Sequence, residues 1–79
     1  NDVALGAGSK TAAAVATSSV SVNGAIYAVA GSGPASTVSV GAPGSERTIT
    51  YVAAGLVSAG STDAVNGSEL YATNQALTP

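Results

Sequence analysis

Small side chains dominate this sequence, and the shortage of bulk limits the folds open to it more than any other feature. Ala, Ser, Gly and Thr fill 46 of the 79 positions, and Val, Ile, Leu and Tyr fill only 19. A single chain of this size buries only about 60 % of its unfolded surface and usually needs a disulfide, a metal or further subunits. Because the chain has no Cys and no His, we expect other copies of the same chain to stabilise it.

Charge and composition exclude several classes of function. Six side chains are charged and the net charge is −2, so the basic surface that nucleic acid or anionic lipid requires is missing. A disordered linker is the alternative for a Gly- and Ser-rich chain, but disorder favours low hydrophobicity and high net charge, and this sequence is 46 % hydrophobic. No run approaches the roughly 20 apolar residues of a membrane span. The start at Asn1 and the end at Pro79 predict a piece of a longer protein.

Four stretches alternate between apolar and polar residues, which predicts short half-buried strands. The second contains Asn23-Gly24, the strongest two-residue turn signal, and predicts a β-hairpin over residues 19–30. Pro34 lies in a Gly- and Ser-rich loop over 31–36, because it cannot donate a hydrogen bond within a central strand. The other three predicted strands cover residues 3–5, 37–40 and 48–52.

The last part of the chain predicts a helix over residues 63–77. Ser61 and Thr62 offer capping hydroxyls, and Asp63 places an acid in the first turn. Gly67 would lie inside this helix, at a cost of about 1 kcal/mol relative to Ala. Leu70, Asn74 and Leu77 fall on one stripe, which indicates either a parallel coiled coil with a polar Asn layer or a surface helix on a globular core. We favour the coiled coil, since the chain offers no other core.

No motif supports catalysis, a cofactor or a metal. Residues 6–11 faintly resemble a phosphate-binding loop, but two of its required glycines are missing. Ser9 and Lys10 are adjacent in a predicted turn, and nothing orients them as nucleophile and base. The four acids stand at positions 2, 46, 63 and 69, which matches neither a catalytic carboxylate pair nor a cation site. Asn66-Gly67-Ser68 fits the glycosylation pattern by coincidence.

Two segments carry a family signature. Residues 39–55 read SVGAPGSERTITYVAAG, and residues 61–71 read STDAVNGSELY. With this spacing they resemble the neck of trimeric autotransporter adhesins, of the form SVG..G.ER.I.NVAAG followed by STDAVN.SQL. Residues 1–9 resemble one YadA-like head repeat, and residues 18–38 resemble an insert found in such heads. The resemblance covers nearly the whole chain.

The resemblance implies a mainly β homotrimer. Three chains would form a left-handed parallel β-roll, with a β-hairpin insert and a neck, ending in a short helix that begins a three-stranded coiled coil. The implied domains are the end of the head over 1–17, the insert over 18–38, the neck over 39–62 and the helix over 63–79.

Ten residues are the candidates for the trimer interface. Arg47 belongs either to a solvated turn or to an ion pair across a subunit boundary, with Asp63 as the candidate acid. The full candidate set is Val38, Val40, Arg47, Ile49, Val52, Asp63, Val65, Leu70, Asn74 and Leu77.

Three positions depart from the family pattern. Tyr51 stands where the family usually has Asn, and its ring cannot repeat the hydrogen bonds of an amide. Glu69 replaces the usual Gln, and would place three like charges near an axis if it faced inward. Leu56 stands where polar or basic residues are common.

The resemblance implies a non-enzymatic segment of a bacterial adhesin on the surface of the Gram-negative outer membrane. The full-length protein would attach the bacterium to host cells or extracellular matrix, and this piece would chiefly connect head to stalk. The alternative is a purely structural trimerising spacer with no ligand of its own. We expect no cofactor, nucleic acid or membrane contact for this segment.

Overall fold

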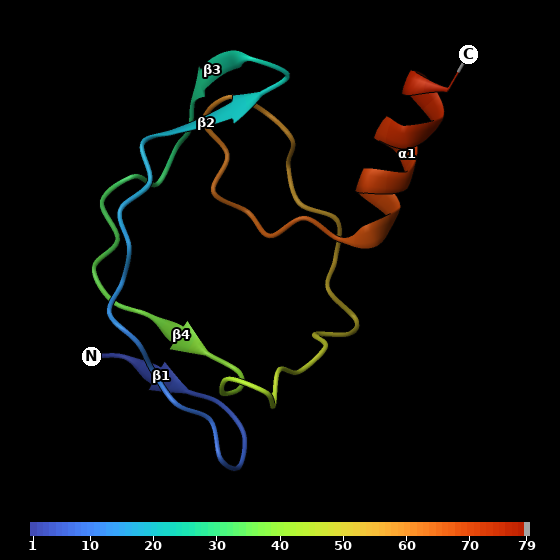
Figure 1. The fold of residues 1–79 in the computed structure, drawn as a ribbon. Helices are drawn as coiled ribbons and strands as arrows, with labels where there is room; N and C mark the ends of the chain where they lie inside the picture. Colours follow the sequence, from blue (N-terminus) through green and yellow to red (C-terminus); the bar gives the residue numbers. More distant parts are fainter. Residues whose placement is uncertain (79) are drawn as a thin grey trace. The chain divides into compact units, whose positions relative to one another are not determined.

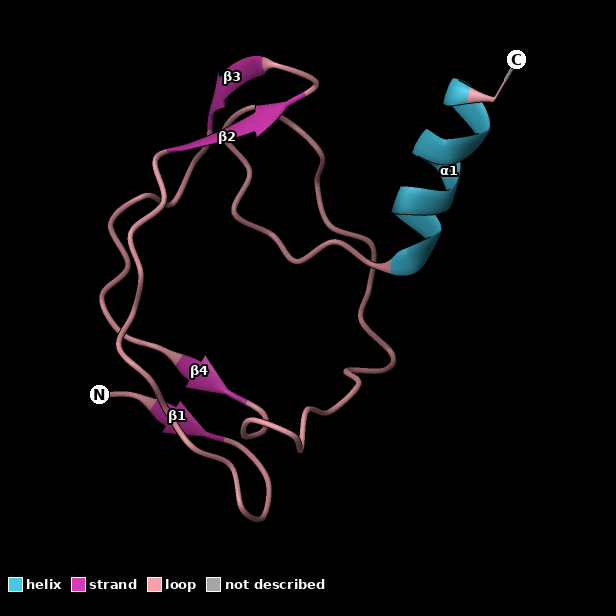
Figure 2. Cartoon of the chain, viewed as in Figure 1, coloured by secondary structure: helices cyan, strands magenta, loops and turns pink. Residues whose placement is uncertain are grey.

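A computed structural model describes residues 1–78 of the chain. It forms two compact units, Asn1–Thr48 and a second unit that begins at Ile49. Loops and turns make up most of both units, with a few short strands and one helix (Figures 1 and 2). The elements are β1 (Val3–Ala4), β2 (Ser19–Val22), β3 (Ala25–Ala28), β4 (Val38–Ser39) and α1 (Gly67–Leu77).

The predicted hairpin is confirmed. Strands β2 and β3 pair antiparallel, with Val22 opposite Ala25 and Ser19 opposite Ala28. The loop between them is Asn23-Gly24, and both residues have positive φ, 51° and 79°. Two positive φ angles define a type I′ turn, whose twist matches that of the flanking strands. The dipeptide therefore sets both the place of the turn and the register of the hairpin.

The strands predicted over 3–5 and 37–40 are confirmed in part, as the shorter β1 and β4. They pair in parallel within the chain, with Val3 opposite Val38. Val3 N–H donates to Thr37 O at 2.8 Å, and Leu5 N–H donates to Ser39 O at 2.7 Å. The Asp2 carboxylate extends the pairing by accepting a hydrogen bond from Thr37 N–H at 2.8 Å. The chain therefore leaves β1, forms the hairpin and returns to lie beside its own start (Figure 1).

The strand predicted over residues 48–52 is wrong, because the structure has no strand there. Alternating side chains favour extended backbone, but a strand also needs a partner for its hydrogen bonds. Tyr51 has φ of 61°, in the left-handed region that a bulky residue rarely adopts. This angle turns the chain in the middle of the predicted strand.

The helix is confirmed, but its predicted start at Asp63 is wrong. Asn66 is the N-cap, and α1 begins at Gly67. The Asn66 side chain accepts a hydrogen bond from Glu69 N–H, and the Glu69 side chain accepts one from Asn66 N–H, which is a capping box. Since Gly67 occupies the first position, the cost of glycine inside a helix does not apply.

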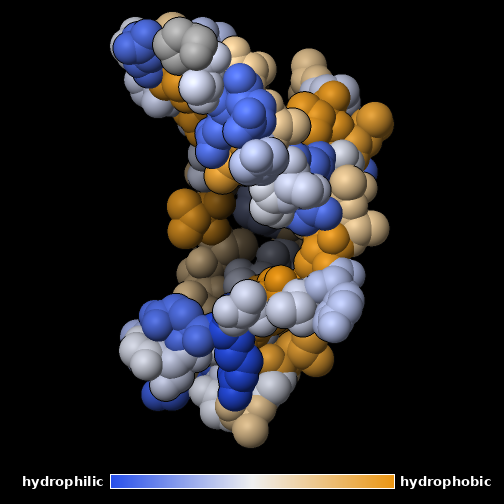
Figure 3. All heavy atoms as spheres, turned by 90° about the vertical axis from the view of Figure 1, so that its right-hand side faces the viewer, coloured by the Kyte–Doolittle hydropathy of each residue, from blue (hydrophilic) through white to orange (hydrophobic). Residues whose placement is uncertain are grey.

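No side chain of the described residues is buried. Sixteen of the large apolar side chains are exposed, including Leu70 and Leu77 on α1, and the remaining three, Val29, Val40 and Val52, are half-buried. Figure 3 shows apolar side chains lying at the surface beside polar ones. An 11-residue helix with no buried residue is marginal by itself. Within residues 1–78, no helix has the length and apolar character needed to cross a membrane.

Tyr51 generates the first prediction, because its backbone is strained and its side chain is fully exposed. Tyr51→Asn should raise the free energy of unfolding by about 1 kcal/mol per chain, since Asn tolerates the left-handed region. Denaturant unfolding measures this change. Tyr71→Asn removes the same ring from an exposed position of α1 and should not stabilise. A destabilising Tyr51→Asn would contradict the assignment of strain.

Candidate functional site

Arg47 fastens the turn that follows β1. Its Nη1 donates to Ser9 Oγ and to Val40 O, each at 2.9 Å, and its Nη2 donates to Ala7 O. Ser9 Oγ in turn donates to Leu5 O at 2.9 Å. One planar guanidinium thus holds three oxygens from two segments that are far apart in the sequence, which a lysine ammonium could not match in geometry.

Gly6 makes room for this guanidinium. It has φ of 107°, and a Cβ at this position would lie 3.2 Å from Arg47 Cζ. The backbone angle therefore favours glycine, and any Cβ would also be tight against the guanidinium. The glycine-rich run over residues 6–9 therefore does more than turn the chain, because it also accepts hydrogen bonds from Arg47.

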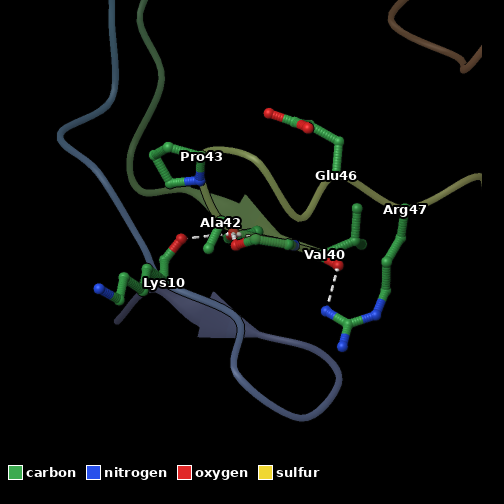
Figure 4. A pocket seen from close by; sticks show the side chains of 8 residues that line it. Lys10, Val40, Ala42, Pro43, Glu46 and Arg47 are labelled. Atoms are coloured by element: carbon green, nitrogen blue, oxygen red, sulfur yellow. Dashed lines mark hydrogen bonds between the residues drawn. The ribbon is translucent and has the colours of Figure 1, made fainter.

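The pocket beside Arg47 does not resemble an anion site. Lys10, Glu46 and Arg47 all line it, together with residues 39–43. In Figure 4 the Arg47 guanidinium turns towards Val40 O, and the Glu46 side chain points away from it. Glu46 instead accepts a hydrogen bond from Gly44 N–H at 3.1 Å. Two of the three charged side chains of this pocket, Glu46 and Arg47, thus stabilise backbone turns of the same chain.

A second set of hydrogen bonds fastens residues 52–56 to the start of α1. Asn66 Nδ2 donates to Val52 O at 2.9 Å. Gly55 N–H donates to Glu69 Oε1 at 2.8 Å, and Leu56 N–H donates to Asp63 Oδ2 at 2.9 Å. Every one of these bonds joins a side chain to the backbone. We call this set the neck clamp, defined by Val52, Gly55, Leu56, Asp63, Asn66 and Glu69.

The neck clamp gives Glu69 a defined role, at a position where the resemblance led us to expect Gln. The same Oε1 atom accepts both Gly55 N–H at 2.8 Å and Asn66 N–H at 3.1 Å. An amide side chain also offers one such oxygen, so Gln could accept the same two bonds. Leu56 contributes its backbone N–H to the clamp, so its side chain can vary without loss of that bond.

Gly55 lies too close to residues 63–64 for any side chain. A Cβ at this position would lie 2.2 Å from Ala64 O and 2.8 Å from Asp63 Cβ. Both distances are far shorter than van der Waals contact. Glycine at the end of the VAAG segment therefore allows the two halves of the neck clamp to approach.

Nine of the ten candidate interface residues fall into three groups, and Asp63 is the tenth. Val38, Val40 and Arg47 belong to the first unit. Ile49, Val52 and Val65 line one pocket of the second unit, where Ile49 and Val65 are 63 % and 60 % exposed. Leu70, Asn74 and Leu77 lie on α1. Asp63 is hydrogen-bonded to a residue of its own unit, and Arg47 is hydrogen-bonded to residues of the first unit. The sequence analysis predicted neither set of partners.

No group of three or more His, Cys, Asp or Glu side chains among residues 1–78 is placed to hold a metal ion. Ser9 Oγ, the hydroxyl that precedes Lys10, is hydrogen-bonded to Leu5 O and to Arg47. The hydrogen bonds of these side chains hold backbone segments together. The role in binding or assembly stays a prediction.

Comparison with known proteins gives two relatives with high identity. The chain is 62 % identical over 71 residues to autotransporter adhesin BtaE of Brucella suis biovar 1 (strain 1330), covering 90 % of this chain and 10 % of that protein. It superposes on the solved C-terminal YadA-like domain of BPSL2063 from Burkholderia pseudomallei with a TM-score of 0.92 and 59 % identity, covering 96 % of this chain and 36 % of that one. The chain thus spans a small part of each relative. No protein-family profile matches it.

The close approach at Gly55 generates the second prediction. Gly55→Ala should lower the free energy of unfolding by at least about 2 kcal/mol, because the methyl group must push residues 63–64 away and break the neck clamp. Gly60→Ala is the matched control in the same unit, since a Cβ there would meet nothing within 4 Å, and it should change stability by less than about 0.5 kcal/mol. Equal effects of the two changes in chemical denaturation would contradict the clamp.

Proposed function

Because the chain belongs to the trimeric autotransporter adhesins, as a structural or adhesive segment and not an enzyme, we propose that three copies assemble side by side into a fibre segment that joins a head to a stalk. The single observation that carries this proposal is the exposure of sixteen large apolar side chains in the described chain. A soluble protein rarely leaves so much of its apolar surface in water. Further copies of the same chain would cover it.

The proposed assembly follows the order of the segments. Residues 1–17 end a left-handed β-roll head, residues 18–38 carry the hairpin insert, residues 39–62 form the neck, and residues 63–79 begin a three-stranded coiled coil. Two features support this order. The parallel β1–β4 pair is the pairing that a β-roll repeats, and α1 carries Leu70, Asn74 and Leu77 on one stripe.

The ten candidate residues named above would face the neighbouring copies. The pocket lined by Ile49, Val52 and Val65 supports this for the second unit, because exposed apolar residues gather there. Burying an aliphatic side chain of this kind contributes about 1.5–3 kcal/mol, and each residue would be buried three times around the axis. Arg47 and Asp63 would contribute chiefly by shaping the backbone that carries these side chains.

The place of the protein would be the bacterial surface. The relation to an autotransporter adhesin of Brucella supports an outer-membrane or surface-exposed protein. Attachment to host cells or extracellular matrix would be a property of the full-length protein, in which this segment acts chiefly as a connector. The second candidate, a trimerising spacer without a ligand, is favoured by the polar clamps, which fix backbone geometry and offer no built ligand site.

The third prediction concerns assembly. Light scattering should give three times the 7.4 kDa chain mass. Val65→Asp should abolish this trimer, because three desolvated carboxylates would meet at the interface. Ser32→Asp adds the same carboxylate at an exposed polar position, outside the candidate set and outside the sixteen apolar side chains, and should leave the mass unchanged. A folded wild-type monomer, or a Val65→Asp protein that stays trimeric with unchanged melting, would contradict the proposal.

The fourth prediction tests whether this segment itself binds a host ligand or only connects other parts of the adhesin. The isolated trimer should not bind immobilised collagen, fibronectin or laminin, because the described residues expose small and apolar side chains with few charges. A solid-phase binding assay measures this, with the full-length protein as the positive control. Saturable binding by the isolated segment would reject the spacer alternative and assign a ligand surface to it.

A further inference from the structure

The chain contains the tripeptide Val-Asn-Gly twice, at residues 22–24 and 65–67. The first copy forms the tip of the β2–β3 hairpin. The second copy precedes and begins α1, with its Asn as the N-cap. Because the local sequence is the same, any difference in the chemistry of the two asparagines must come mainly from the fold.

An asparagine that precedes glycine is prone to one spontaneous reaction with water. The glycine nitrogen attacks the Asn side-chain Cγ, a bond forms between them, the Cγ–Nδ2 bond breaks, and ammonia leaves with the proton of the glycine N–H. Water then opens the five-membered imide at either carbonyl, which yields aspartate or isoaspartate. Glycine favours the attack because it has no Cβ to crowd the ring and its backbone is the least restricted.

The fold leaves Asn23 free for this reaction. Both Asn23 and Gly24 are exposed. Among the hydrogen bonds of residues 1–78, none uses the Asn23 side-chain amide or the Gly24 N–H. The side chain can therefore rotate towards the nitrogen without breaking a bond, and water has access to the product ring.

The fold holds Asn66 by three hydrogen bonds. Its Oδ1 accepts from Ser68 Oγ at 2.7 Å and from Glu69 N–H at 3.3 Å, and its Nδ2 donates to Val52 O at 2.9 Å. Asn66 is also half-buried. Moving its Cγ to the Gly67 nitrogen would break all three bonds and open the capping box at the start of α1.

We propose that Asn23, at the hairpin tip, is a site of spontaneous deamidation in the folded protein, and that the neck clamp protects Asn66 from the same reaction. Residues 11–45 contain no charged side chain, so each event adds the first negative charge to this stretch. Aspartate keeps a residue that tolerates the type I′ turn. Isoaspartate adds a methylene to the backbone and disrupts a two-residue turn whose length sets the register.

The test uses the two cleavage sites that the sequence provides. Trypsin cuts after Lys10 and Arg47, which places Asn23 and Asn66 on separate peptides, 11–47 and 48–79. The full chain is aged at mildly alkaline pH, digested and analysed by tandem mass spectrometry. The acid form should accumulate at position 23, and position 66 should react at least about fivefold more slowly, because its N-cap must first open.

Two controls decide the cause. In denaturant the two tripeptides should react at similar rates, since the fold no longer distinguishes them. Asn23→Gln should remove the signal from peptide 11–47 in native buffer. Equal rates at the two positions in native buffer would overturn the proposal, as would a difference that persists unchanged in denaturant.

Discussion

The hydrogen bonds of Asn66 organise the second unit of the molecule. Its Nδ2 binds Val52 O, its Oδ1 caps α1, and its backbone N–H binds Glu69 Oε1. The same Glu69 Oε1 atom also accepts a hydrogen bond from Gly55 N–H, which links Asn66 to that segment. One residue therefore ends an irregular segment, starts a helix and joins the two. In a chain with no buried side chain among its described residues, such a polar node takes the place that apolar packing holds in larger domains.

Charged side chains serve the same purpose throughout the described chain. Five of the six, those other than Lys10, form hydrogen bonds with backbone groups. Exposed ion pairs contribute little to stability, whereas hydrogen bonds to charged groups contribute about 1.5–3 kcal/mol in favourable cases. A sequence with so few charges uses them to satisfy the donors and acceptors of backbone that has no strand partner or helix turn of its own.

Local signals predicted the hairpin and the existence of the helix, because each depends on a few neighbouring residues. Asn23-Gly24 specifies its turn directly. The helix start was missed because Ser61, Thr62 and Asp63 resemble a cap, although Asn66 with Glu69 three residues later fits the capping box better. The strand over 48–52 was predicted from alternation alone, which carries no information about a pairing partner or about the φ of Tyr51. Two of the three acceptors of Arg47, Ser9 Oγ and Ala7 O, lie 38 and 40 residues away in sequence, beyond any local pattern. The candidate interface stays a prediction.

The pairing of β1 with β4 has a consequence for the evolution of the chain. Residues 11–36 leave and return at fixed points, held by the strand pair, by Asp2 at Thr37 and by the turn over residues 5–10, which Arg47 and Gly41 bind. Once the ends of a loop are pinned, doubling its length costs only about 0.6 kcal/mol of closure entropy. The segment between these fixed points, which carries the β2–β3 hairpin, can therefore be exchanged as a unit. Lengthening, shortening or exchanging it would leave the anchoring frame unchanged, so the hairpin segment can diversify in sequence faster than the frame that holds it.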